Sequence, residues 1–216
     1  MDYEAARRNM VESQIRTNKV THTALLDALS AVPRERFLPP DRAFAAYVDD
    51  DVLVAPGRYL MEPMVFARMV QLAEPTARDR ALLVGAGAGY GAAVLARLVA
   101  SVIALESDPA LAARGKEGLA SLAVTNATQV AGPLAQGWPG KGPYDLILIE
   151  GAVEEVPKAL FDQLADGGRL VAVVKTEGVG RAVLFIERDK VISHRPAFDA
   201  AVPLLTEFRR VPGFVF

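Results

Sequence analysis

Short apolar runs and amphipathic stretches alternate along the last two thirds of the chain. Six runs are typical of buried strands: Ala81–Val84, Val102–Leu105, Ala127–Val130, Leu146–Ile149, Leu170–Val174 and Val183–Ile186. Helical patterns fill three of the gaps, at Tyr90–Val99, Pro109–Leu122 and Val156–Leu164. Strands that alternate with helices form βαβ units, so this part of the chain predicts an α/β fold: a mostly parallel sheet with helices on both faces.

The first seventy-five residues follow a different pattern. Tyr3–Thr17 is charged and amphipathic, which predicts a helix, and Thr21 is placed to cap a second helix with a stripe of leucines. Prolines then interrupt the chain, and Pro63–Leu72 predicts a third helix that begins on its proline. We therefore divide the chain into a helical N-terminal segment, residues 1–75, which packs on the core and covers the site, and an α/β domain, residues 76–216.

A glycine loop follows the first predicted strand of the α/β domain, at Gly85, Gly87 and Gly89. Glycine allows the backbone to turn sharply there and lets a ligand approach closely. The second predicted strand ends at Glu106, whose carboxylate can accept hydrogen bonds from both hydroxyls of a ribose. The loop and the acid together indicate a cofactor that contains adenosine.

Two cofactor classes fit this loop. The spacing of Gly85, Gly87 and Gly89 directly after the strand matches the S-adenosylmethionine loop of methyltransferases. A dinucleotide fingerprint fits only if it begins at Gly87, which leaves two residues between the strand and the first glycine and would favour an NAD-dependent oxidoreductase. The structural alternative is a glycine-rich turn that only packs the helix against the strand.

Composition narrows the classes of function. The chain has 216 residues with a formal net charge of −2, no cysteine and two histidines. The absence of cysteine excludes disulfides, thiolate metal sites and a catalytic thiol. A protein that grips nucleic acid usually has a basic excess, which this chain lacks, so no nucleic-acid partner is expected.

The charge pattern also argues against a membrane role. The uncharged stretch near the middle of the chain, Ala81–Ala96, has 16 residues and several glycines, fewer than the roughly 20 apolar residues that a bilayer needs. Met1–Arg16 is charged and contains no apolar signal segment. We therefore expect a cytoplasmic location, with no membrane partner.

Motifs along nearly the whole chain are similar to those of a known enzyme family. They are Met10–Arg16, Val32–Pro39, Ala46–Asp49, Gly137–Pro139, Tyr144–Ile149, Glu155–Leu160 and Gln163–Leu170. On these motifs the chain resembles the protein-L-isoaspartate O-methyltransferase family. The resemblance implies a Rossmann-like methyltransferase fold with a central, mostly parallel seven-stranded sheet. It also implies methyl transfer from S-adenosylmethionine to a carboxylate of a protein or peptide.

The resemblance also implies the residues of the site. Seven are expected at the cofactor: Gly85, Ala86, Gly87, Gly89, Glu106, Leu134 and Glu150. Three are expected at the acceptor: Tyr59, Leu60 and Met61. We assign no catalytic side chain and no metal, because a carboxylate acceptor is already ionised at neutral pH and methyl transfer depends mainly on alignment. The chain is expected to be a monomer or a small homo-oligomer.

The chain departs from the family at positions that matter for substrate and cofactor. The family's Gly-x-Thr-Ile-Ser-x-Pro run becomes Gly57–Pro63, with Tyr59 at the threonine position and Met61 at the serine position. A thioether cannot replace a hydroxyl as a hydrogen-bond donor, so we expect a changed or lost acceptor, such as a small molecule. Leu83 and Pro133 stand where acidic cofactor contacts are usual. A catalytically silent relative that binds a ligand or partner is therefore the main alternative.

Overall fold

The computed structural model describes residues 1–176 and 178–209. A seven-stranded sheet has the strand order β5-β4-β3-β6-β7-β8-β9. The strands are β3 (Arg80–Val84), β4 (Ser101–Glu106), β5 (Ala127–Ala131), β6 (Tyr144–Val153), β7 (Leu164–Val174), β8 (Gly180–Arg188) and β9 (Val191–Ala200). Strands β3 to β7 are parallel, whereas β8 is antiparallel to both of its neighbours. The expected seven-stranded, mostly parallel sheet is confirmed.

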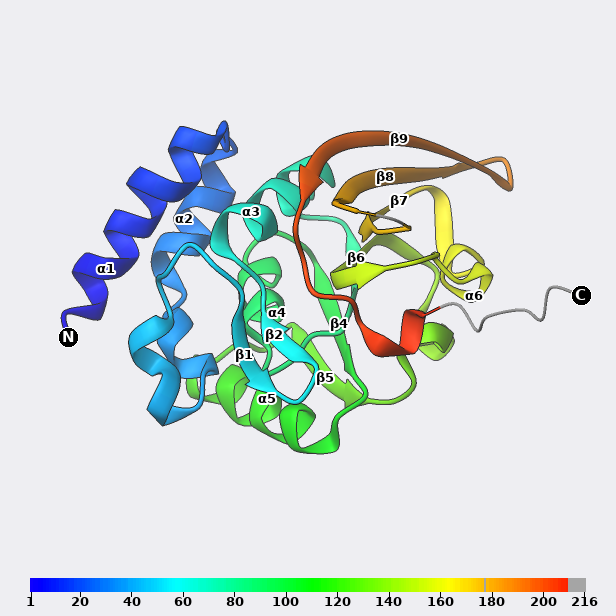
Figure 1. Ribbon diagram of the computed structural model, residues 1–216. Helices are drawn as coiled ribbons and strands as arrows, with labels where there is room; N and C mark the ends of the chain where they lie inside the picture. The colour runs from blue at the N-terminus through cyan, green and yellow to red at the C-terminus, as the bar shows by residue number, and fades with distance from the viewer. Residues whose placement is uncertain (177, 210–216) are drawn as a thin grey trace, which may run out of the picture.

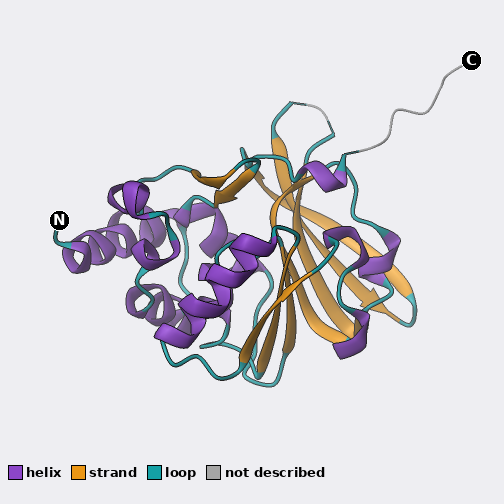
Figure 2. Cartoon of the chain, turned by 90° about the horizontal axis from the view of Figure 1, so that it is seen from below, coloured by secondary structure: helices purple, strands orange, loops and turns teal. Residues whose placement is uncertain are grey.

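The helices cover both faces of this sheet (Figure 2). Within the α/β part they are α4 (Tyr90–Leu95), α5 (Pro109–Ser121) and α6 (Lys158–Phe161). Adjacent residues of β3 belong to two separate hydrophobic clusters, Leu83 to one and Leu82 to the other. Because both faces of the strand are buried, its sequence is apolar throughout rather than alternating.

The N-terminal segment packs against one face of the sheet (Figure 1). It consists of α1 (Tyr3–Asn9), a π-helical turn (Met10–Ile15), α2 (Thr23–Ala31), α3 (Pro63–Leu72) and short 3-10 turns at Arg16–Asn18, Arg34–Phe37 and Pro40–Ala45. Met10, Leu29 and Leu83 share one hydrophobic cluster, so this segment and the sheet have a common core. Its division from the rest at residue 75 stays a prediction.

Four details differ from the sequence pattern. A hairpin, β1 (Val52–Ala55) and β2 (Arg58–Leu60), lies inside the segment that we expected to be helical. His22, not Thr21, caps α2: its ring nitrogen accepts a hydrogen bond from the Leu25 amide at 3.2 Å. Strand β9 was not predicted because most of its side chains are exposed at the edge of the sheet. Helices α4 and α6 are shorter than their periodicity suggests.

The sheet order places the site. The chain moves from β3 to β4 on one side, and later returns to β6 on the other side of β3. Ligands of open α/β sheets bind outside the carboxyl ends of the strands at such a reversal. The glycine loop follows the carboxyl end of β3, and Glu150 lies in the carboxyl-terminal half of β6. Among the described residues, no helix is both long and apolar enough to cross a membrane.

Candidate active site

The glycine loop is fixed to the neighbouring strand through its backbone. The amides of Gly85 and Ala86 both donate to the carbonyl of Leu105, at 2.9 and 3.0 Å. Gly87 and Gly89 have φ angles of +53° and +92°, a region that only glycine adopts easily. A side chain at Gly87 would meet nothing within 4 Å, so this part of the loop has open space beside it. The loop therefore presents backbone where a ligand can approach.

Glu106 ends β4 directly beside this loop and is fully buried. One carboxylate oxygen accepts a hydrogen bond from the Gly87 amide at 2.9 Å. The other accepts from the amides of Ser107 and Asp108, at 2.8 and 2.9 Å. These backbone donors hold the carboxylate in one orientation, at the edge of the loop where an adenosine would bind.

Arg58 from β2 completes the surroundings of Glu106. Its Nε donates to Glu106 Oε1 at 3.0 Å, and its Nη2 donates to the hydroxyl of Ser107 at 2.6 Å. The same nitrogen forms an ion pair with Glu207, in the 3-10 turn Thr206–Phe208. Burial lowers the pKa of Arg58, but the two carboxylates outweigh it and leave that pKa above its usual value. Arg58 thus joins the hairpin to the end of β4 and to the 3-10 turn Thr206–Phe208.

Two small cavities lie beneath the hairpin. The loop-side cavity is lined by Phe37, Val54, Tyr59, Leu60, Met61, Gly85, Ala86, Gly87, Ala88, Tyr90 and Glu150. The acceptor-side cavity is lined by Asp51, Gly57, Tyr59, Met61, Glu150, Gly151, Val202, Pro203 and Leu205. Each has a volume of about 10 Å³, which is room for about one water molecule. Tyr59, Met61 and Glu150 border both cavities, so the glycine loop and the acceptor hairpin meet at these three residues.

Glu150 has an unusual electrostatic environment. Burial raises its pKa to about 8, Arg34 opposes this shift, and Glu106 adds to it. A side chain at Gly91 would collide with the Glu150 carboxyl group, so that carboxyl group lies over the start of α4. Glu150 is therefore protonated at neutral pH and presents a neutral carboxyl group to both cavities.

Arg34 supports the acceptor side from within the core. It is fully buried, its Nε donates to the carbonyl of Ala46 at 2.7 Å, and its Nη2 donates to the carbonyl of Met61. Its guanidinium lies over the ring of Tyr90, 4.9 Å from the centroid. Burial lowers the pKa of Arg34, and the nearby Tyr90 and Glu150 partly restore it. Arg34 thus fixes the backbone at Met61, one of the expected acceptor positions.

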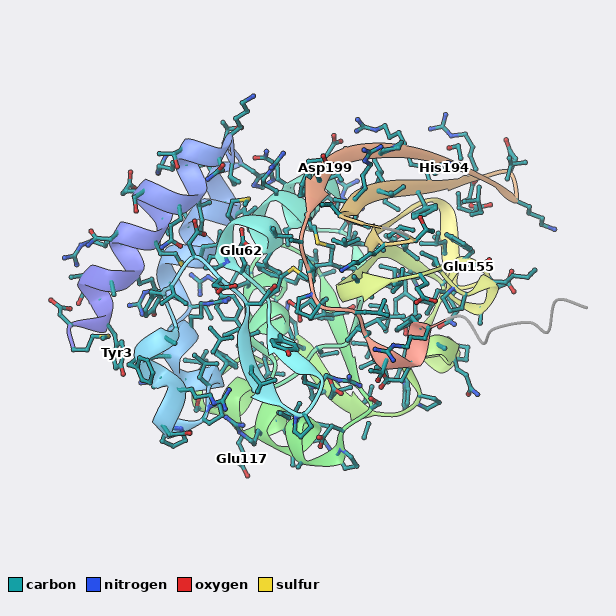
Figure 3. All side chains as sticks on the ribbon, viewed as in Figure 1. Tyr3, Glu62, Glu117, Glu155, His194 and Asp199 are labelled. Carbon is teal, nitrogen blue, oxygen red and sulfur yellow. The ribbon has the colours of Figure 1, made fainter. Side chains whose placement is uncertain are left out.

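Acidic residues form the rim on the acceptor side. Asp51 accepts a hydrogen bond from the Glu62 amide at 2.8 Å, and Glu62 stands at the start of α3 (Figure 3). Burial, together with Asp49, Asp51 and Asp50, raises the pKa of the Glu62 carboxyl to about 7. The rim therefore has a negative potential that grows as the pH rises through neutrality.

The structure brings most of the predicted site residues together. Seven of the ten positions line the loop-side cavity: Tyr59, Leu60, Met61, Gly85, Ala86, Gly87 and Glu150. Glu106 joins them through Gly87, whereas Gly89 is the N-cap of α4 and lines neither cavity. Leu134 is fully buried in the cluster that includes Leu105, and its side chain also lines neither cavity. The roles of these residues stay predictions.

Sequence reasoning missed Arg58, Glu207 and the buried Arg34. Arg58 occupies the variable position of the Gly-x-Thr-Ile-Ser run, so the family pattern does not single it out. The signal that could have identified Arg58 is a cation directly after the turn at Gly57, at the start of a short strand. Leu83, which replaces a usual acid, is fully buried in the hydrophobic core and extends the strand.

The donors and acceptors fit the adenosine half of S-adenosylmethionine. Glu106 can accept from a ribose, and Gly87 leaves room for close approach. β3 ends at Val84, so Gly85 is the first residue of the loop. A dinucleotide fingerprint that began at Gly87 would start two residues after the end of the strand instead of directly after it. The Arg58 Nε donates to Glu106, the same carboxylate on which a ribose is expected.

Comparison with known proteins points to one family. Residues 5–204 match the family model described as protein-L-isoaspartate(D-aspartate) O-methyltransferase. The protein-L-isoaspartate O-methyltransferase of Methanoculleus marisnigri is 36% identical over 203 residues, covering 94% of this chain and 92% of that protein. That of Methanoregula boonei is 39% identical over 186 residues, covering 85% of this chain and 84% of that protein.

Solved structures agree with the fold. A protein-L-isoaspartate O-methyltransferase superposes with a TM-score of 0.80 at 24% identity, covering 92% of this chain and 65% of that longer chain. A Plasmodium falciparum protein described as a protein-L-isoaspartate O-methyltransferase, in complex with S-adenosyl-L-homocysteine, has a TM-score of 0.78 at 18% identity. The superposition covers 96% of this chain and 99% of the Plasmodium falciparum chain. At these identities the structures support the fold alone.

Proposed function

We propose that this chain, which belongs to the protein-L-isoaspartate(D-aspartate) O-methyltransferase family, methylates a carboxylate of a protein or peptide. Members of this family are S-adenosylmethionine-dependent methyltransferases, and this chain is one of them. The acceptor and the residues that hold it are the parts that we propose.

One observation carries the proposal. The glycine loop, Glu106 and the hairpin with Tyr59 and Met61 come from distant parts of the sequence and converge on the loop-side cavity. This convergence lies at the carboxyl ends of β3, β4 and β6, where α/β sheets bind their ligands. This convergence supports adjacent sites for an adenosine cofactor and for an acceptor, which direct transfer requires.

Methyl transfer depends mainly on the alignment of the sulfonium methyl group with the acceptor oxygen. S-adenosylmethionine, when bound, supplies the methyl group of its sulfonium, which passes to a carboxylate oxygen and leaves a neutral thioether. Glu106 and the Gly87 backbone would hold the adenosine, while the hairpin with Tyr59 and Met61 would place the acceptor and exclude water. No side chain has to remove a proton, because the acceptor carboxylate is ionised at neutral pH.

The acceptor pocket differs from the family pattern at its polar position. Met61 is buried, borders both cavities, and offers a thioether where the family has a serine hydroxyl. Tyr59 is 39% exposed and lines both cavities. We propose that this pocket favours an acceptor carboxylate with apolar surroundings and that it methylates isoaspartyl peptides poorly. The acidic rim formed by Asp49–Asp51 and Glu62 favours an acceptor with basic neighbours.

The test is transfer of a labelled methyl group from S-adenosylmethionine. An isoaspartyl peptide, its aspartyl counterpart and a mixture of aged proteins serve as acceptors, and base-labile label reports methyl esters. We expect labelling of the protein mixture that is lost in Glu106→Gln, with weak labelling of the isoaspartyl peptide. Strong, selective labelling of the isoaspartyl peptide would overturn the changed acceptor, and no labelling of any acceptor would overturn the activity.

A catalytically silent relative is the second candidate. The observation that favours it is the Arg58–Glu106 pair, which covers the expected cofactor contact. Titration with S-adenosylhomocysteine, combined with the methyl-transfer assay, separates the two candidates, because an active enzyme must both bind this product and methylate an acceptor. A protein that binds it without methylating any acceptor would support the silent relative.

A further inference from the structure

Arg58 is the one cation in contact with the carboxylate of Glu106 among the described residues. Its side chain is 8% exposed and that of Glu106 is fully buried, so their ion pair is shielded from solvent. Glu207 pairs with the Nη2 of the same guanidinium, and its side chain is 30% exposed. Three elements that are distant in sequence therefore meet at one buried cation: the hairpin, the end of β4 and the 3-10 turn Thr206–Phe208.

The contacts of Glu106 leave little room for a second ligand. Oε1 accepts from the Arg58 Nε and from the amides of Ser107 and Asp108, while Oε2 accepts from the Gly87 amide. A carboxylate has about four lone-pair sites, so Oε1 is fully used. A ribose that binds through both hydroxyls needs an acceptor site on each oxygen. A ribose hydroxyl would therefore have to compete with the Arg58 Nε for Oε1.

We propose that Arg58 competes with the ribose of the cofactor for Glu106, so that this chain sets its own cofactor affinity through a cation on the acceptor hairpin. The proposal rests on the proposed function only for the identity of the cofactor. Cofactor binding replaces the Arg58–Glu106 pair with ribose hydrogen bonds and frees the guanidinium. Both cavities lie next to this contact, because Tyr59, the neighbour of Arg58 on β2, lines each of them.

The position of Arg58 links the two halves of the site. Arg58 and Tyr59 are neighbours on β2, and Tyr59 borders both cavities. When the ribose displaces Arg58, the strand that carries the expected acceptor residues loses its attachment to β4 and to the 3-10 turn. Binding of the cofactor beside Glu106 thereby also frees the hairpin that borders the acceptor-side cavity.

The experiment measures the affinity of the purified full chain for S-adenosylhomocysteine by calorimetry. The variants are Arg58→Gln, Arg58→Lys and Glu207→Gln, and 5′-methylthioadenosine serves as a second probe that has the adenosine without the amino acid. We expect Arg58→Gln to bind both probes about tenfold or more tightly, because the competing charged hydrogen bonds are removed. Arg58→Lys and Glu207→Gln should give smaller gains in the same direction.

Arg181→Gln is the matched control, since it removes the exposed Arg181–Asp199 pair of 3.0 Å far from Glu106 in the fold. It should leave both affinities unchanged. If Arg58→Gln does not fold, the same affinities are measured for Arg58→Lys and Glu207→Gln. Unchanged or weaker binding in the folded variants overturns the competition, even where wild-type methyl transfer is intact. Tighter binding without methyl transfer by any variant supports the competition and overturns the proposed activity. No binding by wild type or variants overturns both.

Discussion

Replacing Glu150 by glutamine should change how the stability of the protein depends on pH. The folded protein holds the pKa of Glu150 at about 8, whereas an unfolded glutamate titrates near 4.5. Because burial favours the neutral form, the stabilising contribution is fully present below pH 4.5 and is lost as the pH rises through 8. Glutamine has nearly the same shape and no charge, so the variant lacks this dependence.

The magnitude follows from the two pKa values. Each pKa unit corresponds to about 1.4 kcal/mol, which gives about 3–5 kcal/mol between pH 4.5 and 8.5 for a carboxyl group in this position. Other groups, including Glu62 with its pKa of about 7, titrate over the same range in both proteins. Their contributions cancel when the free energies of unfolding of variant and wild type are subtracted.

Urea unfolding at pH 5, 7 and 8.5 measures this difference. We expect the Glu150→Gln variant to gain stability relative to wild type steadily across the series. Glu117→Gln is the control, because Glu117 is exposed on α5 and points away from the molecule (Figure 3). Its difference from wild type should stay flat. A flat difference for Glu150→Gln as well would refute the buried, neutral Glu150 on which the electrostatic account of the site depends.

Three further predictions concern the site. The affinity for S-adenosylmethionine relative to S-adenosylhomocysteine should rise between pH 6 and 9 in wild type, because an ionised Glu150 attracts the sulfonium; calorimetry should find no such rise in Glu150→Gln. Met61→Ser should raise kcat/KM for an isoaspartyl peptide about tenfold by restoring a hydroxyl, whereas Met64→Ser, outside both cavities, should not. Arg34→Met should lower the free energy of unfolding by about 2–4 kcal/mol, since two buried carbonyls lose their donor; a loss below about 1 kcal/mol in urea unfolding would contradict this role.

The sheet was predictable because its signal is local and strong. Buried parallel strands are apolar on both faces, and the runs at β3, β4 and β6 differ clearly from the helices between them. Helix α3 was also predicted with its bounds, because a proline begins it. Strand β9 could not be found in this way, since its pairing with β8 leaves most of its side chains exposed.

The site was only partly predictable. The glycine loop and Glu106 have fixed spacings relative to their strands, so their proximity follows from the fold. The contact of Arg58 with Glu106 and Glu207 joins residues 48 and 149 positions apart, and no local pattern reports such a contact. The neutral state of Glu150 depends on burial beneath the hairpin, which the sequence does not show without the tertiary structure.

A crystal structure of the protein with S-adenosylhomocysteine tests the central claim most directly. We expect adenosine beside Gly87, both ribose hydroxyls on Glu106, and the Arg58 guanidinium moved away from that carboxylate. The thioether should lie between the glycine loop and Met61, next to Glu150. Adenosine bound elsewhere, or bound while Arg58 still donates to Glu106, would contradict the account.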